Sequence, residues 1–315
     1  MIDILVPTYN RAKDLEKNLT HLDNLIKKEN VDQHFRILIS NNASTDNTLE
    51  VLEKVKKRIG VEIVIYNQNN NIGLEKNAIF LLEKATSGYV MYIGDDDYLP
   101  EKYLSLLIEL IGKDENLTSI IPGTVALYSD GTLIPGRLES FSEKKYLKGF
   151  STAYEISYLG HQLSGVVQKR NGLYEEYTKK QSLRNIYPFI FFLGYNSLQG
   201  NVYYVPSYKI KISVSNSKDW AYDDSGLLTE IFKNYKMLYP KSPLKRLMLC
   251  FSVMSKQKWR LRVGKNLKLA IKSFNHLVQS SDVDSLVKLT LPFIYLYLYI
   301  KGFFGVLKRK YINAE

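Results

Sequence analysis

Four short apolar segments alternate with four amphipathic segments in the first third of the chain, and this alternation constrains the fold most. The apolar segments span residues 2–9, 35–40, 61–67 and 89–94, and the amphipathic segments span residues 10–29, 44–59, 73–86 and 100–113. Short apolar runs that end in turn residues are typical of buried strands, and apolar residues three or four apart are typical of helices. The pattern therefore predicts an α/β fold with a mostly parallel sheet covered by helices on both faces.

A polar stretch follows each of the four apolar segments. These stretches read PTYNR at residues 7–11, NNASTD at 41–46, NQNNNIG at 67–73 and GDDD at 94–97. The carboxyl ends of parallel strands lie at one edge of a sheet, and ligands bind beyond that edge. We therefore expect the four stretches to line one binding site, which includes the three adjacent carboxylates of Asp95, Asp96 and Asp97.

Four ordered motifs resemble those of the family 2 glycosyltransferases with the GT-A fold, of the bacterial surface-polysaccharide type. They are VPTYNR at residues 6–11, ISNNASTDNT at 39–48, NIGLEKN at 71–77 and YIGDDDYLP at 92–100. The resemblance covers roughly residues 1–110. It implies a Rossmann-like GT-A sheet and a metal-dependent, inverting enzyme. Such an enzyme moves a sugar from a nucleotide-sugar donor, here UDP-linked, to a growing or lipid-linked polysaccharide such as capsule or O-antigen.

The acidic run Asp95–Asp97 is the expected binding site for a divalent cation in such an enzyme. Mg²⁺ or Mn²⁺, held by one or two carboxylates and the donor phosphates, would offset the charge that gathers on the leaving nucleotide. The family's Asp-x-Asp spacing puts Asp97 on the metal, whereas the Asp-Ser-Asp-Asp form puts Asp96 there. We assign the metal to Asp96 and Asp97, and donor contacts to Asp95 and Asp96. The alternative is a solvated acidic turn or a favourable charge at a helix N-terminus.

The resemblance also implies the remaining donor contacts. It puts Pro7, Thr8 and Tyr9 against the nucleoside, and it puts Asn41 where many relatives have an aspartate that hydrogen-bonds the base. An asparagine side chain both donates and accepts hydrogen bonds, so Asn41 could still hydrogen-bond a uracil base. Lys76 stands where relatives often have a basic residue near the diphosphate, although a lysine on a helix is ordinarily only solvated.

An inverting transfer needs a base that takes the proton from the acceptor hydroxyl. Relatives supply a carboxylate at the start of a helix that corresponds to residues 181–195, and this segment contains none. Asp223 and Asp224, close to Trp220, form a carboxylate pair at an expected helix start and are the first substitutes, although a helix cap explains them equally well. The further substitutes are Glu175, Glu176 and His161. The missing carboxylate also leaves open an inactive nucleotide-sugar-binding or scaffold protein.

The positive charge of the chain lies in its last quarter. Residues 241–315 contain 15 Lys and Arg against 3 Asp and Glu, whereas the net charge of the whole chain is +11. Segments 245–274 and 289–311 mix these cations with apolar and aromatic residues, which is typical of an anchor on an anionic membrane surface. The alternative is a helical element that packs on the enzyme or on a second copy in a homo-oligomer. The mixed pattern contains no nucleic-acid-binding motif, so we expect no nucleic-acid partner.

These observations predict a GT-A catalytic domain at residues 1–240 and a helical basic region at 241–315. The catalytic domain divides into a nucleotide-sugar half at 1–110 and an acceptor half at 111–240, which we expect to begin with a hairpin around Asp130 and Gly131. Cys250 is the single cysteine and the N-terminus has no signal-peptide pattern. We therefore expect a cytoplasmic protein, peripheral on the inner face of the cell membrane.

Overall fold

The computed structural model describes residues 1–136, 142–214, 223–264 and 266–312, with side chains as far as Gly302 in the last helix. The chain forms two compact units, each described here by itself. The first unit comprises Met1–Gln181 and Pro188–Ser217, and the second comprises Ser182–Tyr187 and Lys218–Glu315.

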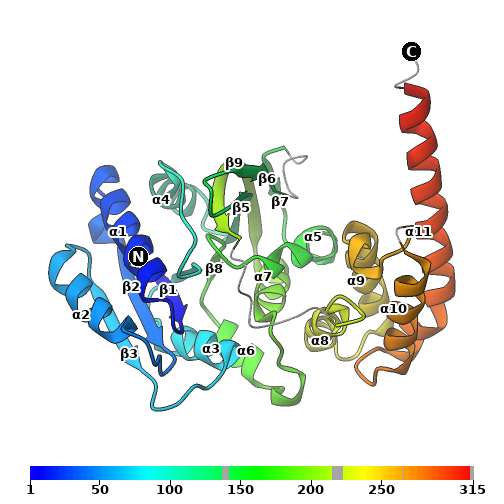
Figure 1. Ribbon diagram of the computed structural model, residues 1–315, viewed down its shortest axis with the longest axis horizontal. Coiled ribbons are helices and arrows are strands. Elements are labelled where there is room, and N and C mark those ends of the chain that lie inside the picture. Colours follow the sequence, from blue (N-terminus) through cyan, green and yellow to red (C-terminus); the bar gives the residue numbers. More distant parts are fainter. Residues whose placement is uncertain (137–141, 215–222, 265, 313–315) are drawn as a thin grey trace. The chain divides into compact units, whose positions relative to one another are not determined.

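The first unit is built on a sheet of nine strands among its described residues (Figure 1). The strands are β1 Ile2–Thr8, β2 Phe35–Asn41, β3 Ile63–Asn67, β4 Tyr89–Tyr92, β5 Leu117–Leu127, β6 Leu133–Pro135, β7 Lys144–Tyr146, β8 Val167–Lys169 and β9 Asn201–Ser213. Their order is β3-β2-β1-β4-β8-β5-β9-β7, and β6 pairs with β5. Strands β1 to β4 are parallel to one another, whereas β8 is antiparallel to its neighbours β4 and β5. The predicted α/β fold with a mostly parallel sheet is confirmed.

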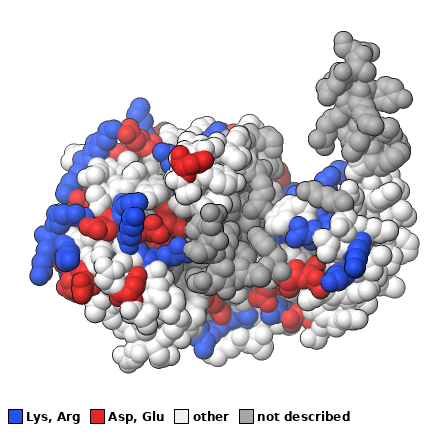
Figure 2. Space-filling model, in the orientation of Figure 1, with Lys and Arg blue, Asp and Glu red and all other residues white. Residues whose placement is uncertain are grey.

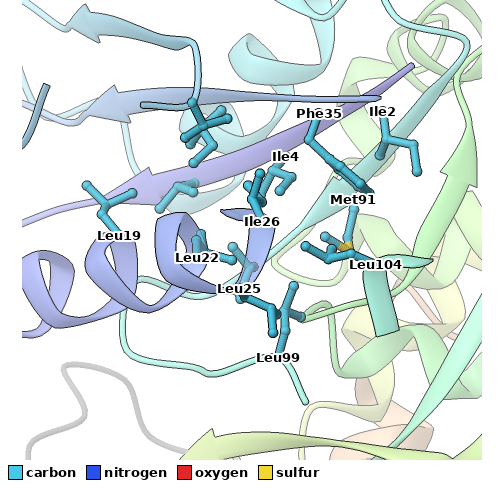
Figure 3. Close-up of a cluster of buried hydrophobic side chains, with 14 of the residues drawn as sticks. Ile2, Ile4, Leu19, Leu22, Leu25, Ile26, Phe35, Met91, Leu99 and Leu104 are labelled. Carbon is cyan, nitrogen blue, oxygen red and sulfur yellow. The ribbon is translucent and has the colours of Figure 1, made fainter. Parts of the chain in front are cut away.

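Helices cover both faces of the sheet. They are α1 Ala12–Glu29, α2 Thr48–Arg58, α3 Leu74–Lys84, α4 Tyr103–Lys113, α5 Phe150–Ile156, α6 Leu173–Thr178 and α7 Pro188–Gln199, with short 3₁₀ turns η1 Asp32–His34, η2 Ser157–His161 and η3 Gln181–Leu183. On one face, α1, α2 and α4 bury a continuous apolar cluster in which Leu22 and Ile26 lie near Ile4 and Met91 (Figure 3). On the other face, the hydroxyl of Tyr92 donates to the backbone of α3, and its ring packs on α7.

The amino edge of the sheet contains an ion pair between a fully buried aspartate and a partly exposed arginine. Asp3 on β1 accepts two hydrogen bonds from the Arg36 guanidinium on β2, at 3.0 and 3.1 Å, and further ones from the backbone of Thr86 and Ser87. Burial raises the pKa of the Asp3 carboxyl, but these hydrogen bonds outweigh it and lower the pKa overall. Asp3 therefore stabilises the strand ends opposite the expected site.

The hairpin that we expected around Asp130 and Gly131 is present between β5 and β6. These strands pair antiparallel, from Val125 with Pro135 to Leu127 with Leu133. Gly131 has a positive φ of 85°, which glycine adopts without strain, and Asp130 accepts a hydrogen bond from the backbone of Thr132. The hairpin extends the sheet away from β1 to β4.

The second unit is helical. Its elements are α8 Leu228–Leu238, α9 Pro243–Lys256, η4 Lys258–Leu261, α10 Leu267–Gln279 and α11 Ser285–Ile312. The structural division falls before α8, whereas we placed the domain boundary at residue 240. The reason is that the charge changes at residue 241, but α8 buries Ile231, Phe232 and Tyr235 and packs on α9. Among the helices of the described chain, none is both long and apolar enough to cross a membrane.

Candidate functional site

The polar ends of the first three strands lie side by side at the carboxyl edge of the sheet. Thr8 at the end of β1 pairs with Asn41 of β2, which in turn pairs with Asn67 of β3. The chain that leaves β4 joins the same edge, because the Thr8 hydroxyl donates to Asp95 Oδ2 at 2.7 Å. The four polar stretches of the sequence are therefore anchored to one edge, as the strand pattern predicted.

Residues 94–97, hereafter the acidic turn, form a tight bend after β4. The backbone N–H of Asp97 donates to the carbonyl of Gly94 at 3.2 Å. A Cβ at position 94 would lie 2.7 Å from Asp97 Oδ2, which is closer than ordinary van der Waals contact. A Cβ at position 94 would therefore displace the Asp97 carboxylate, which glycine allows to fold back over the bend.

Asp97 is buried, and two serines hold its carboxylate. The Ser164 hydroxyl donates to Asp97 Oδ2, and the backbone N–H of Ser213 donates to Asp97 Oδ1 at 2.9 Å. Ser164 also accepts a hydrogen bond from the N–H of Gly94 at 2.8 Å, and the Ser213 hydroxyl donates to the carbonyl of Asp96. These contacts come from the segment before β8 and from the end of β9, and neither serine was identified from the sequence.

Asn18 on α1 holds the acidic turn from the side of the helix. Its side-chain N–H₂ donates to the carbonyl oxygens of both Gly94 and Asp97, the first at 3.2 Å. The side chain is fully buried, and its Oδ1 has no hydrogen-bond partner among the described residues. Asn18 interrupts the apolar stripe of α1 between Leu15 and Leu22, which is a sequence signal that we did not use.

The carboxylates of the acidic turn repel one another. Burial raises the pKa of the Asp95 carboxyl to about 7, and the neighbouring Asp96 and Asp97 add to this against the hydrogen bond from Thr8 and the charge of Arg11. Burial and then Asp96 raise the pKa of Asp97 to about 7, against the hydrogen bonds from Ser164 and Ser213. The site therefore holds more negative charge than the surrounding protein offsets.

This donor set fits a hard divalent cation. Carboxylate oxygens are the ligands that Mg²⁺ and Mn²⁺ prefer, and a bound cation would relieve the repulsion within the acidic turn. The described residues contain no group of three acidic, His or Cys side chains that could hold a metal by themselves. A cation held here would therefore take further oxygen ligands from water or from a bound phosphate, as in many sites that hold Mg²⁺ with one or two carboxylates.

Asn41 is buried, and its amide already makes two hydrogen bonds. Its Nδ2 donates to Asn67 at 3.1 Å, and its Oδ1 accepts from the backbone of Ser44 at 3.1 Å. An amide retains one more hydrogen and one more lone pair, so these contacts orient Asn41 without using its full capacity. Its predicted role in reading the base stays a prediction.

The loop before α3 is tied to the end of β2. Asn77 exchanges two hydrogen bonds with Ser40, at 2.6 and 3.0 Å, and the Asn42 amide donates to Asn71 at 2.8 Å. These contacts fix the first turn of α3, where Lys76 is exposed. The predicted contact of Lys76 with a diphosphate is not tested by these bonds.

Among the candidate bases, Asp223 is hydrogen-bonded within the turn that precedes α8. Its Oδ1 accepts from the Ser225 hydroxyl at 2.7 Å and from the N–H of Leu227 at 2.8 Å, just before α8. Its Oδ2 lies 3.6 Å from His276 Nε2. The adjacent Asp224 is exposed. These bonds hold the turn and stop at Leu227, the N-cap residue of α8, so they do not cap the helix itself. Asp224 is the solvent-facing member of the pair, and the catalytic role of both stays a prediction.

The further substitutes for the catalytic base, Glu175, Glu176 and His161, lie in the first unit. Glu176 pairs with Lys179 at 2.5 Å on α6, and Glu175 beside it is exposed. The ring of His161 has its Nδ1 at 2.7 Å from the carbonyl of Tyr158. Trp220, which we expected to stack on a sugar, lies outside the described residues.

Comparison with known proteins relates this chain to glycosyltransferases. The profile of the family described as "Glycosyl transferase family 2" matches residues 3–199. The abequosyltransferase RfbV of Salmonella typhimurium is 33% identical over 107 residues, which are 34% of this chain and 31% of that protein. The poly(ribitol-phosphate) beta-N-acetylglucosaminyltransferase TarS of Staphylococcus aureus is 28% identical over 102 residues, 32% of this chain and 17% of TarS. The matches therefore span a third or less of these relatives.

Solved structures share the fold at low sequence identity. Residues 1–349 of S. aureus TarS in complex with UDP-GlcNAc superpose with a TM-score of 0.65 and 14% identity, covering 100% of this chain and 92% of that one. The mannosyltransferase PcManGT of Pyrobaculum calidifontis, in complex with GDP-Man and Mn²⁺, gives a TM-score of 0.59 at 12% identity, with 99% and 85% covered. At these identities the likeness shows the GT-A fold alone.

Proposed function

Because the chain belongs to glycosyl transferase family 2, we propose that this glycosyltransferase moves a sugar from a UDP-linked donor to a growing or lipid-linked polysaccharide, with a divalent cation. The observation that carries the proposal is the acidic turn held at the carboxyl edge of the sheet, with Asp95 bonded to Thr8. UDP is favoured because the TarS structures contain UDP-GlcNAc or UDP. A divalent cation is favoured because Mn²⁺ accompanies GDP-Man in the mannosyltransferase.

The donor would lie along the edge from β2 to the acidic turn. Pro7, Thr8 and Tyr9 contact the nucleoside, Asn41 hydrogen-bonds the base, and Lys76 approaches the diphosphate. Asp95 and Asp96 would face the donor, and Asp96 and Asp97 would hold a cation together with phosphate oxygens. When bound, the cation would supply Lewis-acid stabilisation of the negative charge on the departing nucleoside diphosphate.

The acceptor hydroxyl loses its proton to a carboxylate as it attacks the anomeric carbon from the side opposite the nucleotide, which inverts the configuration. We assign this proton transfer to the pair Asp223 and Asp224. Asp224 is exposed and suited to accept a proton, whereas Asp223 makes the hydrogen bonds that fix the turn before α8.

The acceptor class is inferred from the relatives. TarS is named for transfer to poly(ribitol-phosphate), and a Campylobacter jejuni relative, 30% identical over 108 residues, is named for transfer to an undecaprenol-diphosphate-linked saccharide. An acceptor of this kind is a polysaccharide or is carried on a lipid. We therefore propose that the enzyme acts in the cytoplasm, peripheral on the inner face of the cell membrane, where its basic C-terminal region meets anionic lipid.

A donor-hydrolysis screen tests this function without any knowledge of the acceptor. UDP-linked and GDP-linked sugars are incubated with the protein in Mn²⁺ or in EDTA, and released nucleotide is measured. We expect release from a UDP-sugar in Mn²⁺, and its loss in the double variant Asp96→Ala, Asp97→Ala. Glu109→Ala, which removes an exposed carboxylate paired with Lys113 on α4, is the matched control and keeps full activity. Release that survives in EDTA or in the double variant would contradict the proposal.

A nucleotide-sugar-binding protein without turnover is the second candidate. The observation that favours it is the start of α7, where residues 181–195 contain no carboxylate. Tight Mn²⁺-dependent binding of a UDP-sugar without nucleotide release, even with extracts that supply acceptors, would favour this candidate over the enzyme.

A further inference from the structure

Helix α11 has one apolar stripe that packs into the second unit. Val287, Leu291, Ile294 and Leu298 are all buried on this side. The neighbouring helices lie here, since the hydroxyl of Tyr295 donates to Ser273 of α10 at 3.1 Å and the ring of Tyr297 packs on Phe251 of α9. This inner stripe attaches α11 to its own unit.

A second apolar stripe runs along the opposite side of α11. It consists of Leu289, Phe293, Leu296 and Ile300, which are 71%, 71%, 58% and 44% exposed. At 3.6 residues per turn, the centres of the two stripes lie roughly 160° apart around the helix axis. We call these four residues the outward stripe. In Figure 2 the flank of the second unit formed by α11 is largely free of charged side chains.

The composition around the outward stripe favours a lipid surface. Residues 285–302 contain no Asp or Glu and have two lysines, Lys288 and Lys301. Tyr297 and Tyr299 border the stripe and are 44% and 59% exposed. Tyrosine rings at the edge of an apolar surface are typical of the headgroup region of a membrane, where lysines meet anionic lipid.

A second copy of the chain fits this surface less well. In paired helices the positions that flank an apolar seam commonly carry charged residues that choose the partner. Here the flanking positions include Pro292, Tyr297 and Tyr299, and the two lysines of residues 285–302 have no Asp or Glu in that segment to pair with on a second copy. The bordering residues therefore match a lipid interface rather than a helix partner.

We propose that the outward stripe of α11 is the surface through which this protein contacts an anionic membrane. The inference rests on the proposed membrane location and names the element responsible for it. The opposite side of α11 packs on α9 and α10 through the inner stripe, so only one side of the helix can meet lipid. The helix therefore lies in the plane of the membrane, with its inner stripe holding the rest of the unit.

Vesicle co-sedimentation of the full-length protein tests the surface. The double variant Phe293→Gln, Leu296→Gln is compared with Leu244→Gln, Met248→Gln, which removes two residues of α9 that are 62% and 40% exposed. We expect wild-type protein and the α9 variant to bind vesicles of phosphatidylcholine with phosphatidylglycerol, and the α11 variant to bind at least about tenfold more weakly. Pure phosphatidylcholine vesicles should bind all three poorly. The single variant Leu289→Gln provides a second test with a smaller change.

Three results would overturn the inference. The first is unchanged vesicle binding by the α11 variants, and the second is equal binding to the neutral vesicles. The third is a wild-type oligomer in light scattering that the α11 double variant converts to monomer, because a second copy would then cover the stripe. Donor hydrolysis in solution is measured for every variant and should not change, so a failure of the membrane surface is separable from a failure of the proposed function.

Discussion

The substitution Gly94→Ala tests whether the geometry of the acidic turn carries function. The added methyl carbon would lie 2.7 Å from Asp97 Oδ2, 3.2 Å from Asp97 Cγ and 3.4 Å from Asp96 Oδ1. The first contact is about 0.7 Å short of the 3.4 Å at which ordinary contact begins, so the Asp97 carboxylate has to move. It cannot move by this distance and keep both of its present hydrogen bonds, to Ser164 and to Ser213.

The size of the effect follows from those bonds. Overpacking of a buried site costs about 1–3 kcal/mol, and a hydrogen bond to a charged group contributes about 1.5–3 kcal/mol. Because the carboxylate can relieve part of the clash by shifting, the two costs should not add in full. We therefore expect the free energy of unfolding to fall by about 2–3 kcal/mol. For a unit of this size, that corresponds to a fall in Tm of roughly 5–10 °C. Nucleotide release in Mn²⁺ should fall at least about tenfold, because the displaced carboxylate is one of the proposed metal ligands.

The matched control is Gly88→Ala, immediately before β4. A Cβ at position 88 would meet nothing within 4 Å, and Gly88 is not among the glycines with positive φ. We expect this variant to match the wild type or to exceed it slightly in Tm, because alanine restricts the unfolded chain. Both variants are measured by thermal unfolding and by calorimetric titration of UDP with Mn²⁺. If Gly94→Ala matches Gly88→Ala in both measurements, the turn does not depend on the close approach of Asp97, and the argument fails.

Three further predictions are tested by thermal unfolding, UDP binding in Mn²⁺, donor hydrolysis or transfer to an acceptor. Asn18→Ala should weaken Mn²⁺-dependent UDP binding at least about tenfold, because it removes both hydrogen bonds to the acidic turn. The control Asn24→Ala, at an exposed position of the same helix, should not weaken it. Equal binding by the two variants would contradict this role of Asn18. Asp3→Asn should lower Tm at pH 7 without changing donor hydrolysis by the folded protein. The folded pKa of Asp3 lies below its unfolded value near 3.8, so its contribution is present above that value, and the difference in Tm should vanish as pH falls through the folded pKa; a constant difference would refute this. Asp224→Asn should reduce transfer to acceptor far more than donor binding, whereas Asp223→Asn should mainly lower the Tm of the second unit; the reverse pattern would exchange their roles.

The parts of the fold that were predicted from the sequence are those with local signals. Strands β1 to β4 and the helices between them follow from apolar periodicity within windows of a few residues, and strand polarity then brings Thr8, Asn41 and Asp95 to one edge. Strand β9 was not predicted, although it places Ser213 against Asp97 across 116 residues. A contact of this sequence separation leaves no periodic signal. Asn18 did leave a signal, a buried amide within an apolar stripe. The change of charge at residue 241 does not coincide with the start of the compact helical unit, because charge and packing change at different residues.

The pKa values of the buried aspartates at the two edges of the sheet are shifted in opposite directions. At the amino edge, Arg36 and two backbone N–H groups lower the pKa of Asp3, so that the protein itself supplies the balancing charge. At the carboxyl edge, burial and the charge of Asp96 raise the pKa of Asp97 to about 7, because its hydrogen bonds come from the neutral donors Ser164 and the backbone of Ser213 and offset this only in part. Neutral donors orient a carboxylate without cancelling its charge, whereas an arginine would do both. The acidic turn is therefore held in shape but left electrostatically unbalanced, as expected of a site whose counter-charge is a ligand.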